Sequence, residues 1–419
     1  MVPTAGLTYH PPVLFRVAGL FLVVLLLPAC TAAAQELRVY LVTVGPGEKP
    51  WERYGHNALL FEDPQTGESL SYDWGRFDFD QPNFIARFVR GDMLYSSGVS
   101  DGNRVLGFYA DQLDRRVELQ ELALSPEQTR RLLRLCEIAN LPANSQYRYD
   151  YFIANCSTKL RDVLDEALGG QIAEQLQGVP AGTTFRDEAE RHIAYHWPMW
   201  LGFNAGLGRP ADRPIDAWEY TFLPAELRDW LRDVEIAADD GAPRPLVRTE
   251  LLLNEGDAPV TPVDPPSRWW QTGILGLALA AGMLLLTRLR RPGWSLAAAG
   301  LWFLLAGLGG TLLLLLWAFT DHWAAYWNQS LLLLSPLGLP LAFETMTQRH
   351  PRAIRLLAGI HLGLCVLGAL LHLVPGVGQE NLPIIALALP ANAAAAWVAG
   401  LRTGRRQSPT AGDVEMAPA

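Results

Sequence analysis

The sequence predicts an α+β globular domain followed by an all-α membrane domain of five helices. The long apolar runs of the 419-residue chain lie near its N-terminus and after Pro266, whereas residues 35–253 have the mixed composition of a globular domain. That middle region combines short strand patterns with amphipathic helix patterns, and the last third has apolar stretches near the ~20 residues that cross a bilayer. The net charge of −9 makes a nucleic-acid partner unexpected.

The N-terminus has the pattern of an export signal. Arg16 precedes an apolar core, and small residues up to Ala34 follow, which predicts a signal peptide over residues 1–34 that is cleaved after Ala34. Two other interpretations stay open: a lipoprotein signal at Cys30, because LPAC resembles a lipobox, and an uncleaved anchor. All three place the domain that follows outside the cytoplasm.

A β-hairpin is predicted near the start of the globular domain. The stretches HNALLFED and ESLSYDWG have strand patterns, and PQTG between them is typical of a turn. If Asp63 pairs with Glu68, then Ala58 faces Asp73, and His56 lies two residues further along on the same face. This register brings the His56 imidazole and the Asp73 carboxylate within hydrogen-bonding reach.

Two amphipathic helices are expected next. In FIARFVRGDMLY the apolar residues from Phe84 to Val89 have helical spacing, and two interpretations stay open: a helix packed on the core, or a surface that dips into lipid. SPEQTRRLLRLCEIAN starts with a Ser-x-x-Gln capping box and predicts a helix from about residue 126 to 140. The later segment from residue 198 to 224 is rich in Gly, Pro and Trp and predicts a long loop.

The stretch YFIANCSTKLRDVLDEAL predicts a helix that Asn155 or a neighbour caps. Cys156 then lies at the helix N-terminus, where the helix dipole and free N–H groups favour a thiolate and can hold an oxyanion. His56 can take the thiol proton, and Asp73 can orient the imidazole. Cys156, His56 and Asp73 are therefore a candidate catalytic triad.

A structural role for Cys156 stays open. The exported domain contains Cys136 and Cys156, and an oxidising compartment allows a disulfide between them. Cys136 fits equally well as a buried thiol on its helix. His192 and His196 have a spacing that can hold zinc, but no third ligand is evident, so neither a metal nor a cofactor is expected.

Five apolar stretches predict a transmembrane domain over residues 268–402, after a Pro-rich linker at 254–267. They cover residues 269–287, 294–319, 330–345, 355–374 and 382–401. The third stretch, with LLLLSPLGLPLAF, is short and interrupted by proline, which predicts a kinked or partly re-entrant span.

The loop charges orient these spans. Arginines follow the first, third and fifth stretches, whereas loops 320–329 and 375–381 contain no Lys or Arg. The positive-inside rule therefore places the basic loops and the tail at 403–419 in the cytoplasm and the globular domain outside. The outer loop TDHWAAYWNQS carries His322 and Asn328 and is interpreted either as an aromatic interfacial anchor or as a loop that closes over a lipid-binding site.

Several of these motifs, in the same order, resemble the Lnb family of bacterial lipoprotein N-acyltransferases. The likeness rests on WERYGHNALL, YDWGRFDF, FIARFVRGDM, YRYDYFIANCSTKLRD and DHWAAYWNQSLLLLSPL, and it covers most of residues 37–345. A His at a strand start and Asn-Cys at a helix start also resemble the permuted papain-like fold of lecithin:retinol acyltransferase and NlpC-type peptidases. The resemblance implies a permuted papain-like periplasmic domain on a multi-pass protein of the bacterial inner (cytoplasmic) membrane.

The resemblance also implies the reaction. Cys156 takes an acyl chain from a phospholipid donor as a thioester and passes it to the α-amine of a diacylated lipoprotein acceptor, with His56 as the base. Asp73 is the third candidate from the strand register, whereas members of that family often carry Asn in this place, which would orient the imidazole without a charge. Residues near these motifs are expected to bind substrate or support the site: Tyr54, Asn57, Asp150, Asn155, Arg161, His322 and Asn328.

Two other functions stay open. A papain-like envelope hydrolase that cleaves a peptidoglycan peptide or amide would use the same triad, but it has no need of five membrane spans. A non-catalytic, membrane-anchored periplasmic binding module would have kept the fold and would not need the Cys156 thiol.

Overall fold

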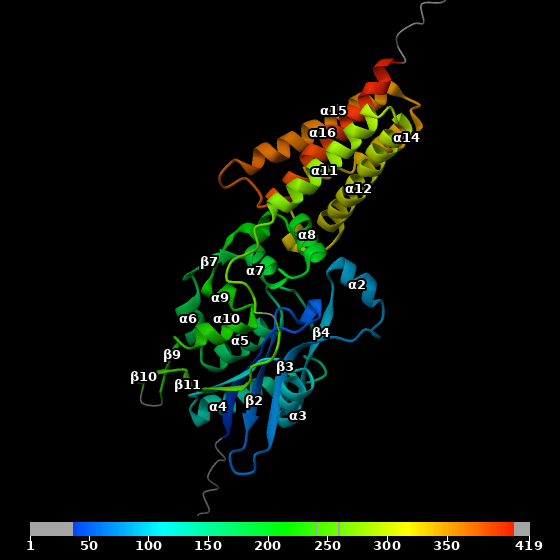
Figure 1. Ribbon diagram of the computed structural model, residues 1–419. Coiled ribbons are helices and arrows are strands. Elements are labelled where there is room, and N and C mark those ends of the chain that lie inside the picture. The colour runs from blue at the N-terminus through cyan, green and yellow to red at the C-terminus, as the bar shows by residue number, and fades with distance from the viewer. Residues whose placement is uncertain (1–36, 239–240, 259, 406–419) are drawn as a thin grey trace, which may run out of the picture.

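The computed structural model describes residues 37–238, 241–258 and 260–405, so the predicted signal peptide and residues 406–419 lie outside the described part. Figure 1 shows a domain built around a sheet and a bundle of long helices that follow one another along the molecule. This arrangement agrees with the predicted α+β domain followed by five apolar helices.

The main sheet is antiparallel and, within the described residues, has seven strands in the order β11-β5-β1-β2-β3-β4-β6. Its strands are β1 (Arg38–Val44), β2 (His56–Glu62), β3 (Ser69–Arg76), β4 (Leu94–Asp101), β5 (Val117–Leu122), β6 (Gln146–Arg148) and β11 (Val247–Asn254). The predicted hairpin register is confirmed, because Ala58 pairs with Asp73. Strand β11 pairs with β5, so a segment far along the chain forms one edge strand of the sheet.

Alternation along the strands gives the sheet two apolar faces. On one face, residues such as Leu59 and Tyr72 pack with Leu132 of α4 (Pro126–Ala139) and Leu160 of α5 (Cys156–Ala167). On the other face, Ala58 and its neighbours pack beneath α3 (Gly102–Gly107) and the π-helical segment η2 (Phe108–Gln112). Each fully buried leucine contributes roughly 1.5–3 kcal/mol of stability.

Smaller elements complete this domain. They are α6 (Gln171–Leu176), α7 (Phe185–His192), α8 (Trp197–Gly206), α9 (Ala217–Tyr220), α10 (Pro224–Leu231), the short helices η1 (Pro50–Glu52) and η3 (Arg209–Asp212), and the strand pairs β7 (Pro180–Thr184) with β8 (Pro214–Asp216) and β9 (Glu235–Ala237) with β10 (Pro243–Pro245). The prediction of a long loop from residue 198 is wrong for α8. Pro198 lies in the first turn of that helix, where its missing N–H costs no hydrogen bond, and Trp200 anchors the helix in the core.

The five predicted apolar stretches are all helical in the described residues, and each is long and apolar enough to cross a membrane. The helices are α11 (Trp269–Arg288), α12 (Pro292–Phe319), α13 (Ser330–Leu333) with α14 (Gly338–Thr347), α15 (Pro351–His372) and α16 (Leu382–Arg405). The kink predicted in the third stretch is confirmed by the break between α13 and α14. Gly310 permits this break to pack on α12, because a Cβ there would overlap the Leu334 carbonyl oxygen.

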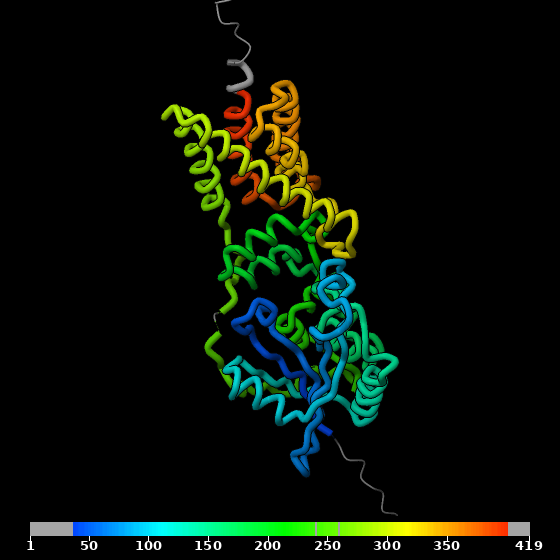
Figure 2. The backbone as a smooth tube through the Cα atoms, turned by 90° about the vertical axis from the view of Figure 1, so that its right-hand side faces the viewer, coloured from blue at the N-terminus to red at the C-terminus, as the bar shows by residue number. Residues whose placement is uncertain are grey.

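The two domains contact each other through the loops at one end of the bundle (Figures 1 and 2). The Asn328 amide donates to the carbonyls of Ala205 and Gly206 in α8, and Gly208 donates to the carbonyl of Ala324 in η4 (Trp323–Ala325). In Figure 1 the β2–β3 turn points away from the bundle. The opposite ends of these strands, where His56 and Arg76 lie, therefore face the helical domain.

Candidate active site

Three elements meet at the end of the sheet that faces the helical domain. His56 is the first residue of β2, Asp73 lies near the end of β3, and Cys156 is the first residue of α5. The turn before β2 requires Gly55, which has φ +83° and no room for a Cβ, since that atom would lie 2.7 Å from the Val44 carbonyl. The chain folds so that residues 56, 73 and 156 come together, as the predicted triad requires.

The three side chains lie next to one another. The His56 Nε2 lies 3.4 Å from Asp73 Oδ2, and both side chains are half-buried. The Cys156 thiol lies near enough to the His56 side chain for each group to influence the charge of the other. Because Asp73 uses Nε2, the other ring nitrogen of His56 is available to exchange a proton with the sulfur. The Arg76 Nε donates to Asp73 Oδ1 at 2.6 Å, so the carboxylate is held from both sides.

The surroundings favour a thiolate–imidazolium pair. Burial opposes both charges, but the His56 charge, its hydrogen bond to the sulfur, and the backbone N–H groups of Asn57 and Ser157 together hold the pKa of the Cys156 thiol below its usual value. Burial likewise opposes the imidazolium, but Tyr109, Cys156 and Asp73 raise the pKa of His56 well above its usual value. The thiol is therefore prepared to act as a nucleophile.

Gly75 lies against Cys156 and was not singled out from the sequence. It has φ +93°, and a Cβ at this position would lie 3.4 Å from the Cys156 Cβ. The β3–β4 register also shifts between Trp74 and Arg76, a bulge of the kind found next to active sites. The glycine in YDWG, between two strand residues, was the available sequence signal.

The N-terminus of α5 is fixed by buried polar side chains. The Asn155 side-chain oxygen Oδ1 accepts from the N–H groups of Ser157 and Thr158, and the side-chain amide nitrogen donates to the carbonyls of Tyr151 and Phe222. Asn155 is thus the cap that the sequence predicted. These bonds fix the backbone that positions Cys156.

A second amide connects α5 to the sheet. Asn57 follows His56 and is fully buried, and its amide donates to Ser157 Oγ and to the Pro224 carbonyl. The Ser157 hydroxyl donates in turn to the Thr221 carbonyl. Asn57 therefore couples the strand that carries the imidazole to the helix that carries the thiol.

Other expected residues support the site from a distance. Arg161 donates to the Trp218 carbonyl, and its guanidinium stacks 3.6 Å from the Trp218 ring centroid. Asp150 accepts from the N–H groups of Phe152 and Ile153. Tyr54 stacks on His192 with ring centroids 5.2 Å apart. These contacts are structural, and in this structure none of the three joins the triad's hydrogen bonds described above.

His322 and Asn328 lie at the contact between the two domains. The His322 Nε2 lies 3.1 Å from the Phe88 carbonyl, and Asn328 is buried against α8. The neighbouring Trp323 Nε1 donates to Asp150 Oδ2 at 2.7 Å, which connects the membrane-side loop to the segment just before α5. The loop thus docks the domains together near the triad.

The cysteines and histidines outside the triad have other surroundings. Among the described residues, Cys136, Cys156 and Cys365 are free thiols, so the possible Cys136–Cys156 disulfide is not formed. Burial raises the pKa of the Cys136 thiol to about 12, which leaves it unreactive in the core. His192 bonds to the Glu188 carbonyl and His196 to Arg53, and the described part of the chain has no cluster of side chains that could hold a metal ion.

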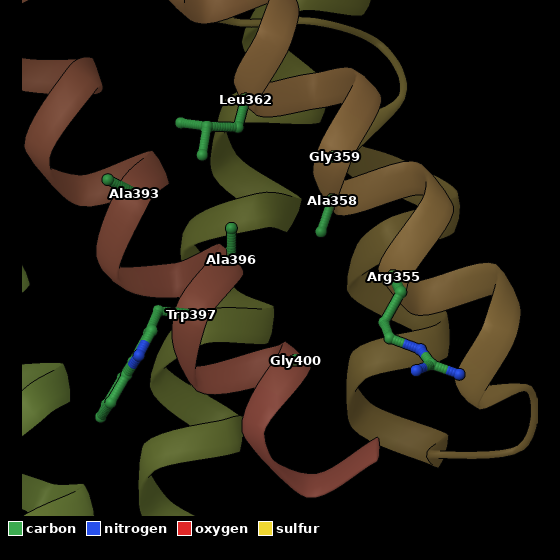
Figure 3. Close-up of a pocket in the computed structure, with 8 residues that line it drawn as sticks. All are labelled: Arg355, Ala358, Gly359, Leu362, Ala393, Ala396, Trp397 and Gly400. Atoms are coloured by element: carbon green, nitrogen blue, oxygen red, sulfur yellow. The ribbon is translucent and has the colours of Figure 1, made fainter. Parts of the chain in front are cut away.

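Two hollows accompany these elements. One of about 660 Å³ lies beside the triad and is lined by Asp73, Arg76, Arg104 and Tyr109 among others. Tyr109 comes from the π-helical η2, a geometry that is common at functional sites and has no clear sequence signal. The other hollow, of about 360 Å³, lies between α15 and α16 near Arg355, at the end of the bundle away from the triad (Figure 3).

Comparison with known protein families finds that two parts of the chain match two domains of one family. Residues 29–187 match the Lnb N-terminal periplasmic domain, and residues 271–399 match the Lnb transmembrane domain. No curated protein and no solved structure matches the chain. The two matches lie in the order seen in the structure, with the sheet domain first and the apolar helices second. The chain therefore belongs to the Lnb family and is a multi-pass membrane protein with a periplasmic N-terminal domain.

Proposed function

We propose that this protein is a lipoprotein N-acyltransferase of the bacterial inner membrane. It moves an acyl chain from a phospholipid, through a thioester on Cys156, to the α-amine of a diacylglyceryl-modified lipoprotein cysteine. The observation that carries the proposal is the meeting of Cys156 at the start of α5 with His56 at the start of β2, on the side of the periplasmic domain that faces the membrane helices. Both substrates are lipids anchored in the bilayer, so a catalytic domain docked at its surface meets them at high local concentration.

The first step forms the acyl-enzyme. The Cys156 thiolate attacks the ester carbonyl carbon of the phospholipid, and the Cys156 N–H and the positive end of the α5 dipole stabilise the oxyanion, because the next two N–H groups are bonded to Asn155. The C–O bond of the ester then breaks, and the His56 imidazolium donates its proton to the departing alkoxide. A lysophospholipid leaves, and the acyl chain remains as a thioester on the sulfur.

The second step releases the acyl chain to the acceptor. The neutral α-amine of the lipoprotein attacks the thioester carbonyl, and the neutral His56 accepts the proton that the nitrogen loses. The C–S bond breaks, and the thiolate leaves beside the imidazolium that has just formed. Asp73, held by Arg76, keeps the imidazole oriented through both steps.

The fold supports this reaction type. Helix α5 begins at Cys156 and packs on the antiparallel sheet, and strand β2 of that sheet begins at His56. This arrangement is expected of a permuted papain-like domain. We infer that fold for the periplasmic domain. The contact with five apolar helices favours transfer between lipids over the hydrolysis of a soluble peptide or amide.

Mass spectrometry of a lipoprotein N-terminal peptide tests the proposal. Cells that depend on this protein for N-acylation should yield triacylated peptide with the wild-type chain and diacylated peptide with Cys156→Ala. Cys136→Ala is the matched control, because it removes the other exported thiol, and it should retain the third acyl chain. The same acylation in wild-type and Cys156→Ala cells would contradict the proposal.

A further inference from the structure

We propose that α2 (Phe84–Arg90) and a row of aromatic rings behind it form the path by which a phospholipid acyl chain leaves the outer leaflet and reaches Cys156. This inference rests on the proposed function, because it concerns the route of the acyl donor. It assigns a lipid-binding role to a helix that makes no contact within the triad. Its support comes from exposure, position and ring geometry.

The first support is the exposed apolar face of α2. No residue of this helix is buried, and Ile85 is 76% exposed, Val89 55% and Phe88 44%. The interpretation of this segment as a helix packed on the core is therefore wrong. Adjacent exposed apolar side chains on a short helix mark a surface that another apolar phase covers.

The second support is the position of α2 at the level where the membrane spans end. The Asp321 N–H donates to the Arg90 carbonyl at 2.8 Å, and Gly91 lies so close to His322 that a Cβ would come within 3.1 Å of its backbone nitrogen. Residues 321 and 322 belong to the loop that joins α12 to α13. Figures 1 and 2 show α2 beside this end of α12.

Exposed aromatic residues extend this surface onto the bundle. Phe319 at the end of α12 is 73% exposed, and Trp327 in the following loop is 65% exposed. Aromatic side chains of this kind mark the interface between lipid and water. The occupant of the α2 surface is therefore the outer leaflet itself, because the same apolar belt continues from the spans onto the helix.

The third support is a continuous row of rings from α2 toward the thiol. Ring centroids are 5.1 Å apart for Phe84 and Phe79, 4.9 Å for Phe79 and Phe77, 5.5 Å for Phe77 and Tyr95, and 4.1 Å for Tyr95 and Tyr149. Tyr149 directly follows β6, on the segment that leads into α5 and its first residue Cys156, and the charges of the two groups interact. The row thus connects the lipid-facing helix to the nucleophile.

The chemistry of the row suits an alkyl chain. Phe79 is 63% exposed and Phe77 38%, so these rings line an accessible surface and are not sealed in the core. Aromatic faces give an acyl chain dispersion contacts and require no hydrogen bonds from it. An acyl chain lying along them would also keep water from the thioester. At the membrane end, Arg90 is exposed in the last turn of α2, where a guanidinium can meet lipid phosphates.

Photocrosslinking tests the position of α2. A benzophenone amino acid replaces Ile85 in the full-length chain, which is reconstituted in phosphatidylethanolamine–phosphatidylglycerol vesicles with alkyne-tagged acyl chains. The control carries the same group at Leu70, which is 48% exposed on β3 but pairs with Asp101 at the end of the sheet away from the helices. Lipid labelling at position 85 without labelling at position 70 supports the path. Equal labelling at the two positions, or no labelling at position 85, overturns it.

A kinetic comparison tests whether the surface delivers the chain. We expect Ile85→Asn with Val89→Asn to slow acylation of Cys156 from vesicle phospholipid by roughly tenfold, because two apolar contacts with the leaflet are lost. Alkylation of Cys156 by soluble iodoacetamide should not change, which shows that the triad is intact. Leu70→Asn with Val99→Asn is the control and should leave both rates unchanged.

The outcomes separate the two proposals. If the wild-type chain takes up no acyl group from the vesicles, the proposed function fails and the path fails with it. If the wild-type chain is acylated and the Ile85→Asn, Val89→Asn variant is acylated at the same rate, the path alone is overturned. A loss of iodoacetamide reactivity in that variant also overturns it, because α2 would then act on the triad itself.

Discussion

At the scale of single residues, the reactivity of Cys156 depends on the charge of one neighbour. The sulfur and the imidazole each raise the stability of the other's charged form, although burial opposes both. The lowered thiol pKa and the raised imidazole pKa define a pH range in which the thiolate–imidazolium pair exists. The edges of that range are measurable.

The pH dependence of Cys156 alkylation should show the lowered thiol pKa. The thiolate persists below the usual thiol pKa of about 8.5, and its reactivity is lost only as the pH falls through the lowered value. In His56→Asn the stabilising charge is missing, so the midpoint should move to higher pH. Peptide-resolved mass spectrometry of iodoacetamide labelling measures both profiles, and identical midpoints would contradict the pair.

Substitution of Asp73 tests how much the orientation of the His56 imidazole depends on a carboxylate. In this structure His56 bonds to Asp73 Oδ2 and Arg76 bonds to Asp73 Oδ1. Asp73→Asn keeps the size of the side chain but leaves one oxygen, which cannot accept from both partners in this geometry. We expect the rate of Cys156 acylation to fall roughly tenfold, the usual weight of one charge-assisted hydrogen bond. Adding Arg76→Gln to Asp73→Asn should recover part of the rate, because the Arg76 guanidinium then no longer competes with His56 for the single side-chain oxygen of the Asn at position 73. A wild-type rate in Asp73→Asn would show that orientation alone suffices.

Gly75 tests whether a close approach of β3 shapes the site. Gly75→Ala adds a Cβ next to Cys156 at φ +93°, and Gly67→Ala adds one at φ +71° in the hairpin turn, where nothing lies within 4 Å. Both should cost about 1–2 kcal/mol of stability, because L-residues disfavour this backbone region. Only Gly75→Ala should also slow the alkylation of Cys156. Equal alkylation rates in both variants would mean that the contact has no effect on the thiol.

At the scale of elements, the N-terminus of α5 has more partners than an ordinary helix cap. Ser125 at the start of α4 accepts from one helical N–H, whereas Asn155 accepts from two and also donates to two carbonyls outside the helix. Ser125→Ala should cost about 1 kcal/mol and Asn155→Ala about 2–4 kcal/mol, because buried carbonyls are then left unpaired. Thermal unfolding of the full-length chain in detergent, followed by near-UV circular dichroism, compares them. Equal losses would show that Asn155 acts only as a cap.

The sequence predicted those elements whose patterns are local. Strand alternation and the turn placed His56 beside Asp73, the capping box located α4, and apolar length with loop charges located the five spans. It did not predict the bulge at Gly75, the π-helix that brings Tyr109 to His56, or the pairing of β11 with β5. These features depend on contacts between segments far apart in the chain, and no local pattern encodes them. For α8, a composition typical of loops was overridden by the tertiary packing of Trp200.

At the scale of the whole molecule, the position of the triad is set by how the domains dock. Trp323 donates to Asp150, and Arg148 forms an ion pair with Asp321 at 2.8 Å, so the segment that leads into α5 is tied to the loop between α12 and α13. The exposed ion pair contributes little by itself, whereas the half-buried indole bond fixes a distance. The thiol is thereby held on the side of the periplasmic domain that faces the membrane helices, as the proposed transfer between two lipids requires.

The acyl-enzyme is the most direct test of this account. The full-length chain is reconstituted in vesicles of phospholipid with deuterated acyl chains, and its peptides are analysed by mass spectrometry before and after hydroxylamine. The account predicts a deuterated acyl group on the peptide that contains Cys156, removed by hydroxylamine and missing in His56→Ala. An acyl group on any other residue, or transfer to a lipoprotein peptide by a chain whose Cys156 never carries one, would contradict it.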